Sequence, residues 1–335
     1  LQAGFQPLAP ALDPALLEAD IAALPAEACL LNQGDSVVYV GRHCQLPHIM
    51  QEIGRGREES FRFVGGGTGQ PLDLSPADEY YDHLFVWSRK DRAVIGAYRL
   101  GRAGEILREH GPPGLVCNAL FDFDASLVER LRETGLELGR SYVLPKYQRS
   151  YGSLLLLWGG IFSFISRHPR YRTTFGSVGI SQGDEYCMAS RTLIVDFLRT
   201  HHNLPEVEAL VHSRTPFRSL EFRAAERRDI RRYVQDADDV SMLVSSLEPD
   251  RKGIPVLIRH YLRMNSKLVA FGVWTAHSRA VVAFTMHSLE HADPRWLTRY
   301  MDREAYHRFL NFHGLPLPEE PKLTEAAPEP EVVVA

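Results

Sequence analysis

Two side chains of opposite charge, Glu137 and Arg140, lie three positions apart in a segment that alternates apolar and polar residues from Leu136 to Val143. The alternation predicts a β-strand, with Glu137, Gly139 and Ser141 on one face and Arg140 on the other. The two charges can share a site only if the strand carries a bulge, which Gly139 would permit. A carboxylate can accept the proton of an attacking amine, and a guanidinium can bind a carboxylate through two hydrogen bonds. The pair therefore predicts chemistry on a molecule with an amine and a carboxylate, and we expect Ser141 to contact it.

A loop rich in hydrogen-bond donors follows this strand and precedes an apolar helix, which we expect from Leu154 to Ser166. The free N–H groups at the start of a helix bind phosphate. The loop therefore predicts a site for a phosphate-bearing donor. Its expected contact residues are Val143, Lys146, Gln148, Arg149 and Gly152.

The arrangement V-x-P-x-Y-[QR] before a glycine and a helix resembles the GNAT acyltransferase fold. Seven segments between Glu52 and Met301 extend the likeness: IGRGREESFRFVGGGTG, DEYYDHLFVW, VIGAYRLG, LELGRSYVLPKYQ, LLLLWGGI, FGSVGIS and PVLIRHYLRMNSKLVAFGV. In this order they resemble the acyl-ACP-dependent N-acyltransferases of ornithine and glycine lipids, often called hemolysins, which are related to acyl-homoserine-lactone synthases.

The resemblance implies that the strand carries a thioester donor and that the loop holds its phosphopantetheine or pyrophosphate. Gly152 falls one residue later than in the usual pattern of the family. This spacing favours acyl carrier protein, which offers a single phosphate on its pantetheine arm, over coenzyme A. The thioester is a co-substrate, and no bound cofactor is expected. The acceptor is expected to be an amino acid or a lyso-lipid.

Amide formation from a thioester needs a deprotonated amine, a base, donors for the oxyanion and an apolar slot for the acyl chain. We expect Glu137 to be the base and Arg140, together with Arg99, to hold the acceptor's carboxylate. The remaining candidates come from a helix expected at 48–63 and from the acidic cluster at 78–83: Arg57, Phe61, Asp78 and Asp82. Phe61 would line the acyl slot, and the two aspartates would bind a cationic amine or position Arg57. The alternative is a buried ion network that only orders the fold.

The order of expected elements predicts an α/β (α+β) fold, in which a mixed, twisted, GNAT-like sheet has helices on both faces and a C-terminal extension. Strands are expected at 84–87, 94–100, 136–143, 177–180, 268–274 and 280–286, and helices at 48–63, 126–134, 154–166, 189–199 and 255–264. We expect an N-terminal lead-in with one short helix (1–45), an acyltransferase core (46–200) and a basic helical insertion (201–245). The acyltransferase domain would then continue over 246–317, before a disordered tail (318–335).

The 335 residues include 38 Lys and Arg against 42 Asp and Glu, a net charge of −4 that argues against a nucleic-acid-binding protein. The four scattered cysteines favour a reducing cytosol, and the longest apolar stretch, 154–165, is too short to cross a membrane. A trimmed N-terminal signal stays open. One segment, 214–232, has seven Arg and three acidic residues. It is either a solvated helix face or a docking patch for an acidic carrier protein or for the anionic inner-membrane surface.

Two other functions remain open. The fold could serve a non-catalytic module that binds lipid or a partner, although such a module need not keep a base. Gly179 to Gly183 also reads G-x-S-x-G, so a serine α/β-hydrolase would use Ser181 with Asp236 and His260. No histidine is followed five positions later by Asp, which argues against a phospholipid-type H-x-x-x-x-D acyltransferase. No metal site is expected, and the glycine cluster at 65–69 is expected to form a mobile loop, which could serve as a lid over the acceptor site.

Overall fold

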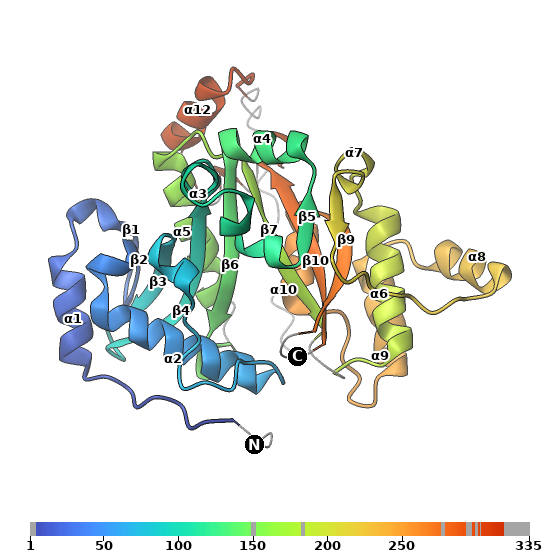
Figure 1. Cartoon of the computed structure of the whole chain (residues 1–335), viewed down its shortest axis with the longest axis horizontal. Helices are drawn as coiled ribbons and strands as arrows, with labels where there is room; N and C mark the ends of the chain where they lie inside the picture. The colour runs from blue at the N-terminus through green and yellow to red at the C-terminus, as the bar shows by residue number, and fades with distance from the viewer. Residues whose placement is uncertain are drawn as a thin grey trace, which may run out of the picture.

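One mixed sheet of eight strands runs through the molecule in the order β1-β2-β3-β4-β6-β7-β10-β9 (Figure 1). The computed structural model describes residues 5–148, 152–181, 185–275, 279–292, 297–298, 301 and 303–317, without the side chains of 224–227, 231 and 291. Neighbouring strands are antiparallel except for the parallel pair β6 and β7. The strands are β1 (Cys29–Gln33), β2 (Ser36–Arg42), β3 (Asp82–Ser88), β4 (Ala93–Arg102), β6 (Gly135–Val143), β7 (Thr173–Ser181), β9 (Lys267–Trp274) and β10 (Ala280–Ser288). A small second sheet pairs β5 (Phe121–Phe123) with β8 (Val211–Ser213).

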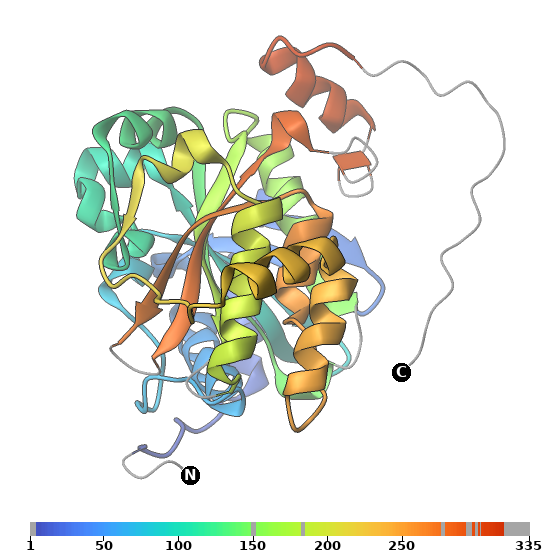
Figure 2. The same cartoon turned by 90° about the vertical axis from the view of Figure 1, so that its right-hand side faces the viewer.

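Helices cover both faces of the large sheet, as Figure 2 shows from the side. One face packs against α5 (Gly152–Arg167), α6 (Met188–His201), α9 (Ala237–Leu247), α10 (Val256–Arg263) and α12 (Arg303–Phe312). The other face packs against α1 (Pro14–Ala23), α2 (Pro47–Phe63), α3 (Ala103–Glu109) and α4 (Ala125–Thr134). The short α7 (Pro205–Glu208) lies beside β8, and α8 (Ala224–Tyr233) extends away from the sheet (Figure 1). The expected α/β architecture with helices on both faces is confirmed.

Every strand and helix that the sequence pattern predicted is present, with bounds shifted by a few residues. The strand pair β1 and β2 was missed, and both strands lie inside the segment expected to be an N-terminal lead-in. β2 is hydrogen-bonded to β3 along its full length, from Ser36 opposite Ser88 to Arg42 opposite Asp82. Residues 29–42 are therefore part of the sheet, whereas the other proposed domain boundaries stay a prediction. The expected tail, 318–335, lies outside the described residues.

The close packing of α5 on the sheet depends on a glycine. A Cβ atom at Gly160 would lie 2.6 Å from a methyl group of Val38 and 2.9 Å from one of Leu84. The helix can therefore approach β2 and β3 closely only because this side chain is a hydrogen atom. The start of α5 is thereby fixed next to the end of β6, where the donor loop lies.

The parallel strands β6 and β7 separate soon after they begin to pair. Their register runs only from Gly135 opposite Thr173 to Glu137 opposite Phe175. Beyond Glu137, β6 keeps its bonds to β4, and β7 keeps its bonds to β10. These central strands therefore separate near Ser177, and side chains of both strands line a cavity in the gap.

Candidate active site

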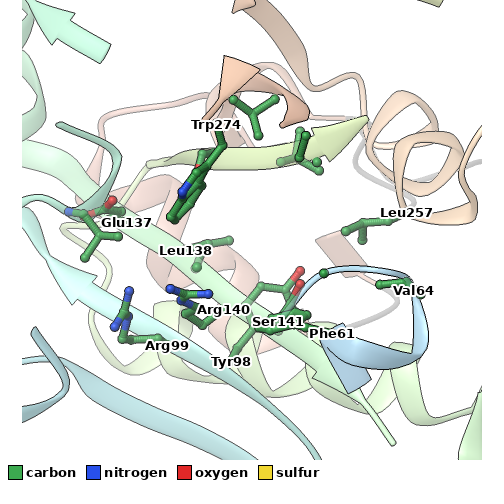
Figure 3. Close-up of a pocket in the computed structure, with 18 of the residues that line it drawn as sticks. Phe61, Val64, Tyr98, Arg99, Glu137, Leu138, Arg140, Ser141, Leu257 and Trp274 are labelled. Carbon is green, nitrogen blue, oxygen red and sulfur yellow. The ribbon is translucent and has the colours of Figure 1, made fainter. Parts of the chain in front are cut away.

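A cavity of about 260 Å³ lies where β6 and β7 separate (Figure 3). Its polar end is formed by Glu137 and Arg99, and Arg140 and Trp274 lie between this end and Val64 at the other. Residues from both faces of the sheet line it, so it passes between the two helical layers. The glycine cluster contributes residues 66–68 to the wall of this cavity, and its role as a lid stays a prediction.

A bulge in β6 turns Arg140 toward the same face as Glu137. In the register with β4, Arg99 faces Gly139 and Ala97 faces Tyr142, so two β6 residues lie opposite Tyr98. Arg140 adopts a φ of 50°, which a residue other than glycine rarely adopts. The expected bulge is confirmed, but Arg140 takes the left-handed conformation, and Gly139 does not. Strain of this kind persists only where the surroundings enforce it, which here means the contacts of the guanidinium.

The Arg140 guanidinium lies between two aromatic rings. Its central carbon is 5.7 Å from the ring centre of Phe61 and 5.6 Å from that of Trp274. One guanidinium nitrogen lies 3.1 Å from a carboxylate oxygen of Asp73. Burial lowers the pKa of Arg140, although Asp73 opposes this shift. An arginine keeps its charge even so. It therefore offers a positively charged, oriented fork to an anion in the cavity.

Glu137 is buried and accepts three hydrogen bonds. The Tyr81 hydroxyl and the Val116 N–H, at 3.1 Å, donate to Oε2, and the Cys117 N–H donates to Oε1 at 2.7 Å. Burial and the nearby carboxylate raise the pKa of Tyr81 well above its usual value, so this phenol remains a proton donor. All three partners donate, which matches a charged carboxylate that fixes the segment after Leu115 to the central strand.

Arg57, Arg99 and Asp78 form a buried triad beside the cavity. Asp78 Oδ1 accepts from Arg57 at 2.8 Å and from Arg99 at 3.2 Å. The two guanidinium groups hold the pKa of Asp78 well below its usual value, even though burial alone would raise it. Burial and Arg57 lower the pKa of His83 to about 3, so this imidazole adds no charge at neutral pH. Asp78 thus positions Arg57, one of its two expected roles, and its charge is already paired.

Asp82 lies apart from this triad. Its two oxygens pair with Arg42 Nε and Arg102 Nε, each at 2.7 Å, and it is not among the residues that line the cavity. The sequence reasoning grouped it with Asp78 because the two are close in the chain. The turn from the 3₁₀ helix at Pro76–Glu79 into β3 separates them in space.

A second cavity, of about 410 Å³ and mostly apolar, lies next to the first, at the start of α5. Of the expected donor residues, Val143 and Gln148 line it, together with Leu154 and Leu157 of α5. The Gln148 side chain donates to the Val143 carbonyl at 2.7 Å, which closes the loop. The lining also includes Phe61 and Ser141, two of the residues expected at the substrate.

The other donor-loop residues lie outside this lining. Lys146 is exposed, and its ammonium group lies 4.6 Å from the ring centre of its neighbour Tyr147. Gly152 is the first residue of α5, and Arg149 lies outside the described residues.

Sequence reasoning missed several lining residues because they lie far from Glu137 in the chain. Trp274 comes from β9, and Tyr261 from α10, where its hydroxyl lies 3.5 Å from that of Tyr98. Asp73 precedes the acidic cluster and was not singled out. Tyr98 stands in the quoted segment VIGAYRLG, and its position next to Arg99 was the one available signal.

Comparisons with known proteins agree with this geometry. The family model described as Acetyltransferase (GNAT) domain matches residues 57–158. Glycine N(alpha)-acyltransferase of Bacteroides thetaiotaomicron is 30% identical over 256 residues, which cover 72% of this chain and 74% of the relative. The chain belongs to the GNAT family of acyltransferases. Glycine N(alpha)-acyltransferase of Phocaeicola vulgatus is 29% identical to this GNAT acyltransferase, over 72% and 76% of the two chains.

Among solved structures the likeness is remote. A CoA-dependent acyl-homoserine lactone synthase with SAM and isopentyl-CoA is 9% identical, with a TM-score of 0.37 over 84% of this chain and 91% of that one. Another CoA-dependent acyl-homoserine lactone synthase, MesI, is 11% identical, with a TM-score of 0.34 over 84% and 97%.

The α/β-hydrolase interpretation of Ser181 is wrong. This serine ends β7 in a mostly antiparallel sheet, opposite Val281 of β10, rather than in the parallel sheet of that fold. The two residues proposed as triad partners of Ser181 make other contacts. Asp236 caps the N-terminus of α9, and the ring centre of His260 lies 5.3 Å from that of Trp158. Within the described residues, no group of three potential ligands could hold a metal ion, and no helix is long and apolar enough to span a membrane.

Proposed function

We propose that this GNAT acyltransferase transfers a fatty acyl group, with or without a 3-hydroxyl, from the thioester of an acyl carrier protein to the amine of a small amino acid. Glycine is the leading acceptor because the two curated relatives carry that name. Ornithine is the alternative acceptor. The product would be an N-acyl amino acid that serves as a lipid or as a lipid precursor.

One observation carries this proposal: the polar and the apolar cavity are adjacent and share part of their lining. Phe61, Val64, Ser141 and Leu257 line both of them. A donor whose acyl chain lies in the apolar part can therefore bring its thioester carbon toward Arg140 and Glu137. A soluble metabolite without a chain would leave the apolar part unused, so the cavity favours an acyl group of some length.

The acceptor would bind through its carboxylate. Arg140 faces the cavity between its two aromatic rings, and Arg99 also lines it. Arg99 is 1% exposed, and its Nε has no hydrogen-bond partner within the described residues. Leaving a buried donor unpaired is costly, so this N–H supports a site for a carboxylate oxygen. The α-amine of such an acceptor would then lie toward Glu137.

Glu137 would accept the proton of the attacking amine, directly or through a water. A carboxylate has about four acceptor positions, and a hydroxyl and two backbone N–H groups fill three of them. The amine would compete for the fourth with the Cys117 thiol, a weak donor that also interacts with this carboxylate. The amine nitrogen then bonds to the thioester carbon, the carbon–sulfur bond breaks, and the thiolate leaves with the carrier. The hydroxyls of Tyr98 and Tyr261 line the same cavity and could donate to the oxyanion.

The donor loop supports acyl carrier protein over coenzyme A. Gly152 opens α5 one residue later than the spacing that the family uses for a pyrophosphate. A single phosphate needs fewer N–H groups than a pyrophosphate does. The test is kcat/KM with the same acyl group on acyl carrier protein and on coenzyme A. We expect the carrier protein to be preferred at least tenfold, and an equal or higher value with coenzyme A would overturn the choice of donor.

Contact with an anionic membrane surface is part of the same proposal, because the product is amphiphilic. The segment 214–232, with seven Arg and three acidic residues, leads into α8, which extends from the body of the protein (Figure 1). Tyr233, at the end of α8, is 71% exposed. Flotation with vesicles rich in anionic lipid tests this membrane contact. Equal binding to neutral vesicles would contradict it.

Expression in a host that lacks amino-acid lipids tests the whole proposal. Mass spectrometry of the lipid extract should show N-acyl amino acids that an empty vector does not produce and that the Arg140→Lys variant produces in smaller amounts. An unchanged lipid profile, with soluble protein present, would instead favour a non-catalytic module.

A further inference from the structure

The polar cavity has one wall that neither the acceptor's carboxylate nor the donor would use. Arg99, Arg140 and Glu137 form the charged side, and Phe61, Ser141 and Leu257 also line the apolar cavity. This part of the wall comes from the C-terminal strands β9 and β10: Trp274, Ala280 and Val282. Trp274 is by far the largest of the three, and Figure 3 shows its indole reaching toward Arg140 and Leu138.

We infer that Trp274 restricts the acceptor to an amino acid with little or no side chain, an inference that rests on the proposed function. If the carboxylate is held by Arg140 and the amine lies toward Glu137, the Cα atom lies between these two residues. The ring of Trp274 is 5.6 Å from the Arg140 guanidinium. A substituent on Cα would therefore meet the indole, whereas the hydrogen atoms of glycine would not.

Gly139 forms the floor between the same two residues and offers a matched control. A Cβ atom built there meets no heavy atom within 4 Å, and the φ of Gly139 lies outside the left-handed region. An alanine at this position therefore fits without strain, and its methyl group lies in open space within the cavity lining. Gly139→Ala narrows the acceptor space, whereas Trp274→Ala widens it.

The two substitutions should shift specificity in opposite directions. A pocket of matched shape discriminates a missing or added methylene group by roughly ten- to two-hundredfold. For Trp274→Ala we expect the ratio of kcat/KM for ornithine to that for glycine to rise at least tenfold. For Gly139→Ala we expect kcat/KM for alanine as acceptor to fall more than that for glycine.

The experiment measures N-acyl products by mass spectrometry from an equimolar mixture of glycine, alanine, serine and ornithine, with one acyl donor. The melting temperature and the KM for the donor are measured for each variant. If Trp274→Ala does not fold, Trp274→Leu replaces it in the same measurement, because leucine keeps an apolar side chain of intermediate size. An acceptor ratio that stays unchanged in folded variants with a normal donor KM overturns the inference. A wild-type protein that acylates none of the four would instead refute the proposed function.

Discussion

Replacing Glu137 with Gln changes hydrogen bonding as well as charge. The carboxylate accepts from the Tyr81 hydroxyl and from the Val116 and Cys117 N–H groups, with a donor at each oxygen. A glutamine amide has one acceptor oxygen and one NH₂ group that donates. In either orientation of the amide, its NH₂ group faces a backbone N–H that has lost its acceptor. The substitution is therefore expected to destabilise the fold as well as remove the charge.

The size of the loss follows from these contacts. A hydrogen bond to a charged group contributes about 1.5–3 kcal/mol, and a buried donor left unpaired adds about 1–3 kcal/mol. Because some relaxation is expected, Glu137→Gln should lower the free energy of unfolding by roughly 2–4 kcal/mol. At about 2–4 °C per kcal/mol for a domain of this size, the melting temperature should fall by roughly 4–16 °C. Loss of a general base should also lower kcat by at least about 10²-fold at pH 7.

A pH series separates the base from the structural anchor. The fraction of free amine rises tenfold per pH unit below the amine pKa, so solvent increasingly replaces a missing base. If Glu137 is the base, the deficit in kcat of Glu137→Gln should shrink as pH rises. If Glu137 only fixes the segment after Leu115, the deficit should stay constant with pH. Tyr81→Phe, the control, removes one donor and keeps the carboxylate, so its kcat should stay near wild type. A stable Glu137→Gln variant with wild-type kcat would refute both roles.

Three further substitutions probe the remaining parts of the site. Arg140→Lys cannot form the two parallel hydrogen bonds that a guanidinium makes with a carboxylate, so the KM for the acceptor should rise at least about tenfold. The KM for the donor should stay unchanged. An unchanged acceptor KM would exclude Arg140 from carboxylate binding. Glu58 accepts from the N–H groups of Thr68 and Gly69, each at 2.8 Å, and these bonds lower its pKa although burial opposes them. A carboxyl group whose pKa is lowered by folding stabilises the fold at pH values above its unfolded pKa of about 4.3. At pH 7 the wild type should therefore have a higher melting temperature than Glu58→Gln. This difference in melting temperature should close as the pH falls below about 4. A difference in melting temperature that does not depend on pH would contradict this role of Glu58. Leu154→Trp should reduce kcat/KM for long-chain acyl donors at least tenfold and leave kcat/KM for short-chain donors unchanged. An equal loss of kcat/KM for long and short donors would show that the apolar cavity does not hold the acyl chain.

Hydrophobic alternation and helical periodicity were enough to predict the central elements. β6 and α5 carry recognisable patterns, since apolar and polar residues alternate in the first half of β6 and α5 is apolar on nearly every side. β1 was missed because it has only five residues, of which only Leu30 is buried. Its place at the edge of the sheet depends on pairing that the local sequence does not encode. β2 reads SVVYVGR, a run of β-branched and aromatic residues that does indicate a strand, and it was overlooked.

The candidate site could be predicted where its residues are close in the chain. Glu137, Gly139 and Arg140 fall on one strand, and the need for a bulge followed from their spacing. Which residue adopts the left-handed φ did not follow, because the contacts of Arg140 with Phe61 and Trp274 come from distant elements. For the same reason the sequence could not separate Asp78, which pairs with Arg57, from Asp82, which pairs elsewhere.

The most direct test of the central claim is the stoichiometry of the reaction with purified protein, an acyl carrier protein thioester and glycine. Released thiol and N-acylglycine are measured in the same samples, by a thiol reagent and by mass spectrometry. The account predicts one thiol for each amide formed, with no thiol release when the acceptor is omitted. Thiol release without amide, or no turnover with any amino acid, would contradict the proposal that the cavity between β6 and β7 joins an acyl chain to an amine.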